Sequence, residues 1–410
     1  MFSAYSQILK IPGAARFSLA GAVLRTPMSM MGISTILSVK AIYGNYTIAG
    51  LLTASSIVAA AITAPILARL VDQHGQLRTM GPSLTVCGIS VIALITCFFL
   101  AAPLWVVFIF SIISGATSGS PGALVRSRWL KVTASSPTHL PTAYALESAI
   151  DELIYIVGPI LATILGASIH PTTGLVLSAL CTSVGGYAFL SQRSTEPTPM
   201  THTDEHTSAP SVLRDPAVIV LVLTYIGAGA LFGANDVSVI AFAEEQGAPA
   251  YSGILLAVFA LGSLCAALIY GSRTWLHPLW KLFAVGVFAL ALGVTTFLCA
   301  NNLWVLGTVM LISGLTCAPT LTNVNMIITK IVRPQQLTEG LAWMSTSLTL
   351  GVSLGSAVAG PAIDSSSSYG GFIVMVIFAW IMVAVMLAGL SRLRRGVEKP
   401  AMHPSDLLDA

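Results

Sequence analysis

The chain has 410 residues, of which 55% are hydrophobic and 9% are charged, with a formal net charge of +3 and a mean hydropathy of +0.85. Soluble globular domains carry about 25% charged residues, so the composition excludes a soluble protein. The small, dispersed net charge gives no indication of nucleic acid as a partner. The apolar runs are long and unalternated, which excludes an outer-membrane barrel with its short segments of alternating polarity. The sequence therefore predicts an all-α membrane protein.

Twelve apolar segments are long enough to cross a bilayer, because a transmembrane helix needs about 20 apolar residues in succession. They lie at approximately 17–39, 46–69, 80–101, 104–125, 142–168, 172–191, 216–241, 251–271, 280–299, 303–328, 338–362 and 370–390. Of the 19 Lys and Arg residues, all but Arg25 and Lys40 flank these segments on one side of the membrane. By the positive-inside rule that side is the cytoplasm. We expect a multi-pass protein of the cytoplasmic membrane with both termini cytoplasmic.

A polar segment divides the chain into two halves. Residues 191–215 are rich in Thr, Ser, Pro and His, a composition that cannot form a packed core and is typical of a flexible linker. We predict a six-helix half at residues 1–191, a cytoplasmic linker at 192–214, and a second six-helix half with a cytoplasmic tail at 215–410.

The two halves also resemble each other in sequence. Span four contains ISGATSGSPGAL from Ile113, and span ten contains ISGLTCAPTL from Ile312; spans five and eleven contain AYALES and GLAWMS at nearly the same separation. Pro121 and Pro319 lie in the matching segments of spans four and ten, and they predict equivalent helix bends in both halves. Parallel six-span repeats are a transporter architecture, with the substrate site between the halves near the bilayer midplane.

The loop after span two reads LARLVDQHGQLR and ends at Arg78. Here the sequence resembles the major facilitator superfamily, whose signature places a glycine, an aspartate, a second glycine and several basic residues in this loop. Asp72 and Gly75 match in position, and Arg78 keeps one positive charge. Ala68 replaces the first glycine, and glutamines replace two of the basic residues. The resemblance covers nearly the whole chain and implies the twelve-helix fold of that superfamily.

The aspartate of this loop has a physical role that we can predict. A carboxylate at the end of span two can face the N-terminus of span eleven near Leu337 and Thr338, where unpaired amides and the helix dipole favour an anion by about 0.3 to 1 kcal/mol. Asp72 would then stabilise the state that is closed to the cytoplasm. The alternative is an ordinary solvated turn in which Gly75 is a helix cap.

A second feature resembles the family in span five. Gly158 and Pro159 resemble the Gly-Pro motif of antiporters, although Ile154 and Ala162 replace its flanking glycines. The amino-acid sequence of several short segments also resembles that of drug-efflux-like facilitators of actinobacteria. This resemblance implies a helix bend at Gly158 and Pro159 and favours antiport, but it identifies no substrate.

Five ionisable residues lie inside predicted spans: Arg25, Glu147, Asp151, Glu152 and Asp236. A charge at the bilayer centre costs at least roughly 2.5 to 3.5 kcal/mol on insertion scales, so such residues pair with one another, face a cavity or carry function. Arg25 in span one and Asp151 in span five lie at similar depths, because both spans start from the cytoplasm. We expect Arg25 to form an ion pair with Asp151 or Glu152.

The acids of span five are candidates for proton coupling. Glu147 and Asp151 are four residues apart and share a helix face. One nearby arginine cannot neutralise both, and burial beside a like charge disfavours ionisation, so we expect one acid to bind a proton during transport. The alternative is a structural ion pair that locks spans one and five together, with Glu147 reaching the cytoplasmic surface.

Four further residues are candidates for a substrate cavity: Asn235, Asp236, Tyr155 and Trp343. Asp236 follows a stretch with three glycines, which permits close helix packing or local unwinding. Contact with a substrate or a cation is one interpretation of Asp236, and a gate residue on the outer side is the other. For the two aromatic residues the alternative is ordinary packing or lipid contact.

No motif for enzymatic chemistry is present in the sequence. HExxH, GxxxxGK[ST] and GxSxG are all missing, and the six cysteines have no metal-ligand spacing. We expect no enzymatic activity, no metal and no cofactor, with a proton gradient as the energy source. The predicted protein is a monomeric secondary active transporter that exports a small molecule by alternating access in exchange for protons. The alternatives are a proton symporter or facilitator for uptake, and a membrane receptor or scaffold that does not transport.

Overall fold

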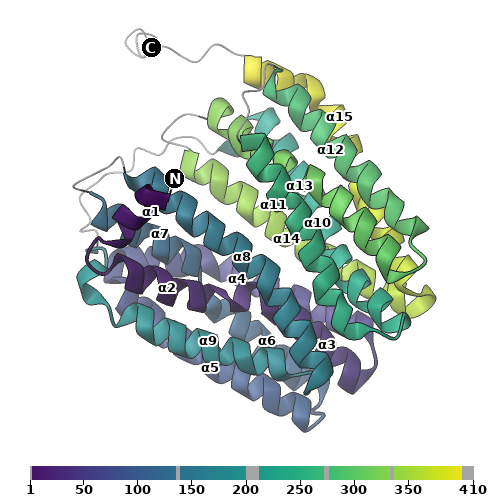
Figure 1. Cartoon of the computed structure of the whole chain (residues 1–410), viewed down its shortest axis with the longest axis horizontal. Helices are drawn as coiled ribbons and strands as arrows, with labels where there is room; N and C mark the ends of the chain where they lie inside the picture. Colours follow the sequence, from purple (N-terminus) through teal and green to yellow (C-terminus); the bar gives the residue numbers. More distant parts are fainter. Residues whose placement is uncertain (1, 135–138, 200–211, 272–276, 333–336, 399–410) are drawn as a thin grey trace.

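The structure is a computed structural model that describes residues 2–134, 139–199, 212–271, 277–332 and 337–398. Within these ranges the regular secondary structure is helical, and twelve helical segments are long and apolar enough to cross a membrane. Figure 1 shows them as two inclined bundles. The predicted all-α membrane fold with twelve spans is therefore confirmed.

The first bundle contains helices α1 to α9. Their bounds are α1 (Phe2–Leu9), α2 (Ala14–Arg25), α3 (Pro27–Tyr43), α4 (Tyr46–His74), α5 (Gln76–Phe99), α6 (Leu104–Ser118), α7 (Pro121–Val132), α8 (Leu140–Ser168) and α9 (Thr173–Leu190). Helices α2 and α3 together form span one, and α6 and α7 together form span four. A short 3₁₀ turn, η2 (Arg193–Thr195), follows α9.

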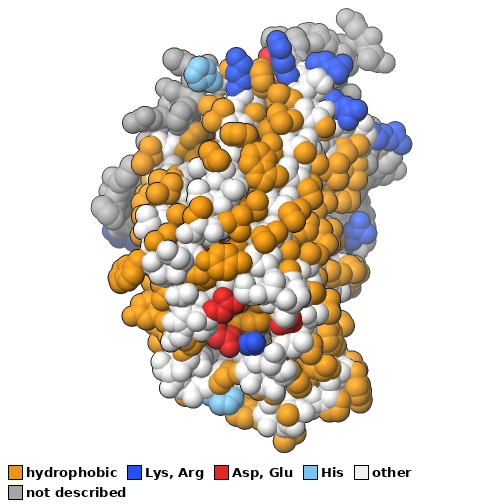
Figure 2. Space-filling model, turned by 90° about the vertical axis from the view of Figure 1, so that its right-hand side faces the viewer, with side chains coloured by type: hydrophobic (Ala, Val, Ile, Leu, Met, Phe, Trp, Pro, Cys, Tyr) orange, Lys and Arg blue, Asp and Glu red, His pale blue; other side chains and the backbone are white. Residues whose placement is uncertain are grey.

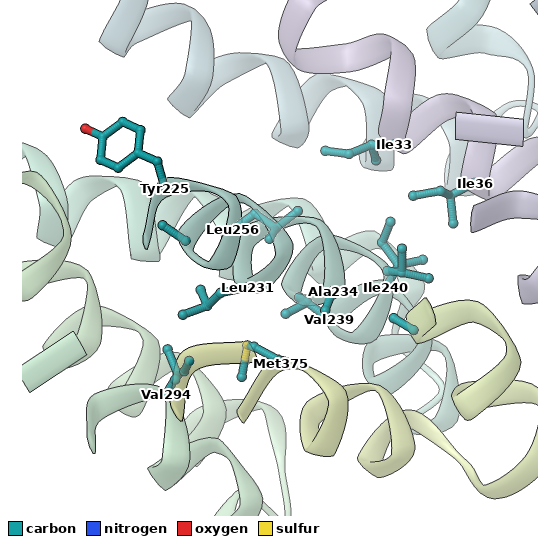
Figure 3. Close-up of a cluster of buried hydrophobic side chains, with 14 of the residues drawn as sticks. Ile33, Ile36, Tyr225, Leu231, Ala234, Val239, Ile240, Leu256, Val294 and Met375 are labelled. Carbon is teal, nitrogen blue, oxygen red and sulfur yellow. The ribbon is translucent and has the colours of Figure 1, made fainter. Parts of the chain in front are cut away.

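The second bundle contains helices α10 to α15. Their bounds are α10 (Pro216–Glu245), α11 (Ser252–Gly271), α12 (Leu279–Thr295), α13 (Leu303–Ile331), α14 (Leu337–Ser366) and α15 (Ser368–Glu398). Helix α10 is the most enclosed span and packs against both α14 and α15. The main core cluster extends across the bundles, since it joins Leu231 and Ile240 of α10 to Ile33 and Ile36 of α3 (Figure 3).

Two spans of the first bundle are broken where proline begins a new helix. In span one, α2 ends at Arg25 and α3 begins at Pro27, with Thr26 between them. In span four, α6 ends at Ser118 and α7 begins at Pro121, with Gly119 and Ser120 between them. Gly119 has a φ of +66°, which glycine adopts at no steric cost. In the second bundle Pro319 lies inside the continuous helix α13. The predicted equivalence of the bends at Pro121 and Pro319 is therefore wrong, because only span four has the glycine that lets the chain leave the helix.

The repeated Ile-Ser-Gly sequence makes the same contact in each bundle. A Cβ atom on Gly115 of α6 would lie 2.2 Å from the carbonyl oxygen of Ser56 on α4, and one on Gly314 of α13 would lie 2.2 Å from that of Phe259 on α11. Spans four and two therefore approach as closely as spans ten and eight. The sequence match between the halves thus corresponds to an equivalent helix interface, which supports duplication.

The two bundles meet along two helix pairs, α4 with α14 and α8 with α11. In the first pair a Cβ atom on Gly50 would lie 2.2 Å from the carbonyl oxygen of Ser356. In the second pair one on Gly253 would lie 2.3 Å from the carbonyl oxygen of Pro159. Gly50 lies near the start of α4, and Gly253 lies at the start of α11, so the close contacts between the bundles gather at one end of the molecule.

The two ends of the molecule carry different charges, and Figure 2 shows basic side chains at one end and a small acidic group with a single basic side chain toward the other. We call the first the basic end; it includes Arg78, Lys131, Arg193, Lys281, Lys330, Arg392 and Arg395. We call the second the acidic end; it contains Lys40, Glu244 and Asp364, which all contact Tyr46, and Glu245, which contacts Ser368. The close contacts between the bundles lie at the acidic end.

Candidate functional site

An ion network lies inside the first bundle where α2, α7 and α8 meet. The guanidinium group of Arg25, the last residue of α2, forms ion pairs with Glu147 and with Asp151, the latter at 2.6 Å. Its Nε donates to the carbonyl oxygen of Gly21 at 3.1 Å. The side chain of Arg25 is 1% exposed. The predicted ion pair between Arg25 and Asp151 is present.

Glu147 is the most enclosed member of this network, with a side chain that is 0% exposed. Besides Arg25, it accepts hydrogen bonds from Ser18 Oγ at 2.6 Å and from Trp129 Nε1 at 2.7 Å. The indole ring of Trp129 packs edge-on against Phe17. Glu147 is thus a buried carboxylate with several donors, and the interpretation that it reaches the surface is wrong.

A second arginine completes the network. Arg126 of α7 contacts Asp151 at 3.0 Å, and this pair is partly exposed at 38% for Arg126 and 26% for Asp151. Among the described residues, two arginines therefore face Glu147 and Asp151, whereas the sequence predicted one. The premise that an acid of this pair lacks a basic partner is wrong.

The sequence prediction missed Arg126 and Trp129 because it placed Arg126 in a cytoplasmic loop beyond span four. The interruption at Gly119 and Ser120 starts a second helix, α7, which turns these side chains toward α8. The sequence Gly-Ser-Pro-Gly from Gly119 is a local signal for that break, since glycine and proline both end helices. Nothing in the sequence, however, shows which helix the new segment packs against.

Glu152 differs from its neighbour Asp151. It forms no ion pair within the described part of the chain and is exposed. Glu152 is therefore not part of the ion network formed by Arg25, Glu147, Asp151 and Arg126.

Tyr155 lies one turn along α8 and is 48% exposed. Glu152 precedes it by three residues on the same helix. Asp236 lies on α10 of the second bundle. The structure thus places Glu152 and Tyr155 on one helix of the first bundle and Asp236 on a helix of the second.

Asp236 has no ion-pair partner among the described residues. The neighbouring Asn235 is 4% exposed, and its Oδ1 atom lacks a hydrogen-bond partner in the described part of the molecule. Helix α10 is continuous here, so local unwinding is not observed. Instead, Cβ atoms on Gly229 and Gly233 would each lie 2.0 Å from a carbonyl oxygen of α14, so these glycines serve close packing.

The remaining predicted site residues occupy other places. Trp343 of α14 is half-buried against the main core cluster. A Cβ atom on Gly158 would lie 1.9 Å from Ser29 Oγ on α3, so Gly158 lets α8 pack closely against span one. Pro159 lies inside the continuous helix α8, and its carbonyl oxygen faces Gly253 of α11.

The loop of Asp72 forms a tight turn at the basic end. Helix α4 ends at His74, and Gly75, with a φ of +90°, joins it to α5. Asp72 and Arg78 are exposed. The predicted contact of Asp72 with Leu337 and Thr338 falls on side chains outside the described residues. The observed geometry agrees with the cap role of Gly75.

The acidic end is closed by polar contacts between the bundles. The backbone amides of Tyr46 and Thr47, at the start of α4, donate to the carboxylate of Asp364 at 2.9 and 2.6 Å. Tyr46 Oη donates to Glu244 at 2.5 Å, and the Lys40 ammonium lies 4.5 Å from the centre of the Tyr46 ring. The sequence prediction missed these contacts because Asp364 lies at a helix end, where an acid is unremarkable.

Comparison with known proteins places the chain in one family. The model of the Major Facilitator Superfamily matches residues 17–271 and 217–406. The crystal structure of the nucleoside transporter NupG matches with a TM-score of 0.70 and 12% identity, covering 93% of this chain and 99% of that one. A bacterial homolog of the human lysosomal transporter Spinster, in an inward-facing and occupied conformation, matches with a TM-score of 0.69 and 15% identity, covering 95% and 98%. No curated protein sequence matches.

Proposed function

Since this chain belongs to the Major Facilitator Superfamily, we propose that it exports a small molecule in exchange for protons by alternating access. The basic end then faces the cytoplasm, in accordance with the positive-inside rule. In this proposal the conformation described above, which is closed at the acidic end, is the state that opens toward the cytoplasm. Rocking of the two bundles would separate α4 from α14 and α8 from α11 at the acidic end and bring their other ends together.

The observation that carries this proposal is one unpaired acid in a membrane span of each bundle. Glu152 lies on α8 and Asp236 on α10, and neither has an ion-pair partner among the described residues. An acid without a basic partner binds a proton more readily than a paired one. We therefore assign proton binding to Glu152 and Asp236.

The ion network of Arg25, Glu147, Asp151 and Arg126 takes a different role in this proposal. Each of its carboxylates has an arginine partner, and Glu147 has two further donors. Protonation of such a carboxylate would leave a buried arginine without its counter-ion, which is costly. The network thus holds α2, α7 and α8 together as one rigid unit during rocking.

Transport into inverted membrane vesicles with an imposed pH gradient, screened over a chemically diverse panel, tests the proposal. Glu152→Gln and Asp236→Asn mimic the protonated acids with little change in size. We expect both variants to insert into the membrane and to bind substrate. They should no longer accumulate the substrate against its concentration gradient. Glu398→Gln, an exposed acid at the end of α15, is the matched control and should transport like the parent protein.

Three outcomes would contradict the proposal. Full gradient-driven transport by both variants would show that Glu152 and Asp236 do not carry the proton. Movement of a substrate without accumulation would indicate a facilitator, and accumulation only in right-side-out vesicles would indicate uptake. The fold match to a nucleoside transporter makes nucleosides suitable members of the panel for the uptake alternative.

A further inference from the structure

A cavity of about 440 Å³ lies at the basic end of the first bundle. Its walls come from three places in the chain: the turn between α4 and α5, the end of α7, and the segment that follows α9. Arg78, Lys131 and Arg193 each contribute a side chain from one of these places, and His74 lines it as well. The lining contains one acidic residue, Glu196. The cavity therefore has an excess of positive charge.

The single acid is engaged by the protein backbone. The carboxylate of Glu196 accepts a hydrogen bond from the backbone amide of Leu77 at 2.9 Å. The Lys131 ammonium donates to the carbonyl oxygens of Ser194 at 3.2 Å and Glu196 at 2.6 Å. These contacts fix the segment after α9 against the ends of α5 and α7. Specific bonds thus hold the wall of the cavity in place at Ser194 and Glu196.

A buried arginine supports the same wall from within. Arg128 is 0% exposed, and its Nη1 donates to the carbonyl oxygen of Gln192 and to Thr195 Oγ1, both at 3.0 Å. Its guanidinium carbon lies 3.8 Å from the centre of the Phe189 ring. The Nη2 atom has no hydrogen-bond partner in the described part of the structure. A further positive charge with an unused donor therefore adjoins the wall formed by Arg193 and Glu196.

The backbone adds to the attraction for an anion. Helix α5 begins at Gln76, so the positive end of its dipole borders the cavity, with the Leu77 amide already bonded to Glu196. Arginine and lysine together with a helix N-terminus are the groups that proteins use to bind phosphate. The chemistry of this cavity selects an anion with several oxygen acceptors.

We propose that this cavity binds a phosphate group, carried either by the headgroup of an anionic phospholipid or by a soluble phosphate compound. The cavity lies at the ends of membrane-spanning helices, where lipid headgroups are close and basic pockets attract them. Arg78, Lys131 and Arg193 supply the charge-assisted hydrogen bonds. Because the site is separate from Glu152 and Asp236, its occupancy is measured as binding and does not depend on the proposed direction or coupling of transport.

The test uses the purified full-length chain in a lipid-free neutral detergent. Inorganic phosphate and phosphatidylglycerol are titrated separately while bound ligand is counted by native mass spectrometry and the midpoint of thermal unfolding is followed. Diacylglycerol, which lacks the phosphate, is the negative ligand. We expect saturable binding of at least one phosphate compound. Arg78→Gln and Arg193→Gln should each weaken it about tenfold, the effect of one lost charge-assisted hydrogen bond.

The outcomes distinguish a lipid headgroup from a soluble phosphate compound as the ligand, and both from the absence of a site. Binding of phosphatidylglycerol alone identifies a lipid site, and binding of inorganic phosphate with no gain from the lipid identifies a site for soluble compounds. Arg392→Gln, an exposed arginine of the other bundle, is the matched control and should leave binding unchanged. Absence of binding to both phosphate compounds, or equal binding to the Arg78→Gln, Arg193→Gln and Arg392→Gln variants, would overturn the proposal.

Discussion

At the scale of single residues, burial decides how much an ionic contact contributes. Arg25 and Arg126 both contact Asp151, yet Arg25 is 1% exposed and Arg126 is 38% exposed. An exposed ion pair contributes about 0 to 1 kcal/mol because water screens it. A buried charge that loses its partner costs much more, because no water replaces the partner.

We therefore predict unequal effects of replacing the two arginines. Arg25→Met leaves the buried carboxylate of Glu147 without its counter-ion and should lower the free energy of unfolding by about 3 to 5 kcal/mol. Arg126→Met should lower it by about 1 kcal/mol or less. Denaturant unfolding in detergent, followed by tryptophan fluorescence, measures both. Equal effects would mean that Glu147 does not depend on Arg25.

The sequence predicted part of this site, and particular residues show why. The pairing of Arg25 with Asp151 followed from equal depth in two spans, a property that residue counting along a helix provides. The partners Arg126 and Trp129 could not be predicted in the same way. Their positions depend on the direction that α7 takes after Gly119 and Ser120, and packing between helices sets that direction.

At the scale of helices, glycines determine how closely two helices approach. A Cβ atom on Gly233 of α10 would lie 2.0 Å from the carbonyl oxygen of Val352, and one on Gly355 of α14 would lie 1.9 Å from that of Ala230. The two backbones thus contact each other directly, as in other helix pairs with small residues four apart.

Gly233→Ala should therefore be destabilising although alanine favours helix. The added methyl group forces α10 and α14 apart, and overpacking of this kind typically costs about 1 to 3 kcal/mol. Gly81→Ala on α5 is the control, because its Cβ would meet Leu77 at an ordinary 3.8 Å. The midpoint of thermal unfolding in detergent should fall for Gly233→Ala and stay near that of the parent for Gly81→Ala. The opposite order would show that α10 and α14 tolerate separation.

The sequence predicted helices better than it predicted their contacts. Hydropathy located every span, because apolar length alone decides whether a helix crosses a bilayer. For the glycines before Asp236, the sequence left close packing and local unwinding open. The structure has close packing, and the reason is a second pair of glycines, Gly351 and Gly355, which lie 122 residues after Gly229 and Gly233 on α14. A single-sequence pattern does not reveal such a pairing.

At the scale of the whole molecule, the closed acidic end is a set of contacts that the proposed rocking of the bundles would break. The backbone amides of Tyr46 and Thr47 donate to Asp364 across the interface between the bundles. Neither hydropathy nor charge could predict which end is closed, because every conformation of a transporter has the same sequence. The structure supplies this information through the positions of close contacts.

Weakening this contact should open the acidic end more often. Asp364→Asn removes the negative charge that the first amides of α4 contact, so the peptide covering the start of α4 should exchange its amide hydrogens faster. Hydrogen exchange of the detergent-solubilised protein, read by mass spectrometry, measures the change. Glu398→Gln, at the basic end, should leave this exchange unaltered. Unchanged exchange in Asp364→Asn would show that the glycine contacts alone keep the end closed.

Helices α4 and α14 each carry an aspartate close to their C-terminal end, Asp72 and Asp364 respectively. Asp364 occupies the N-terminus of α4 in the conformation described here, and we expect Asp72 to face the N-terminus of α14 in a conformation closed to the cytoplasm. Each helix start would then have its anion in only one of the two conformations. The two interactions, each worth about 0.3 to 1 kcal/mol, would favour opposite conformations. Neutralising either aspartate should shift the populations a few-fold, in opposite directions, and neutralising both should restore their ratio.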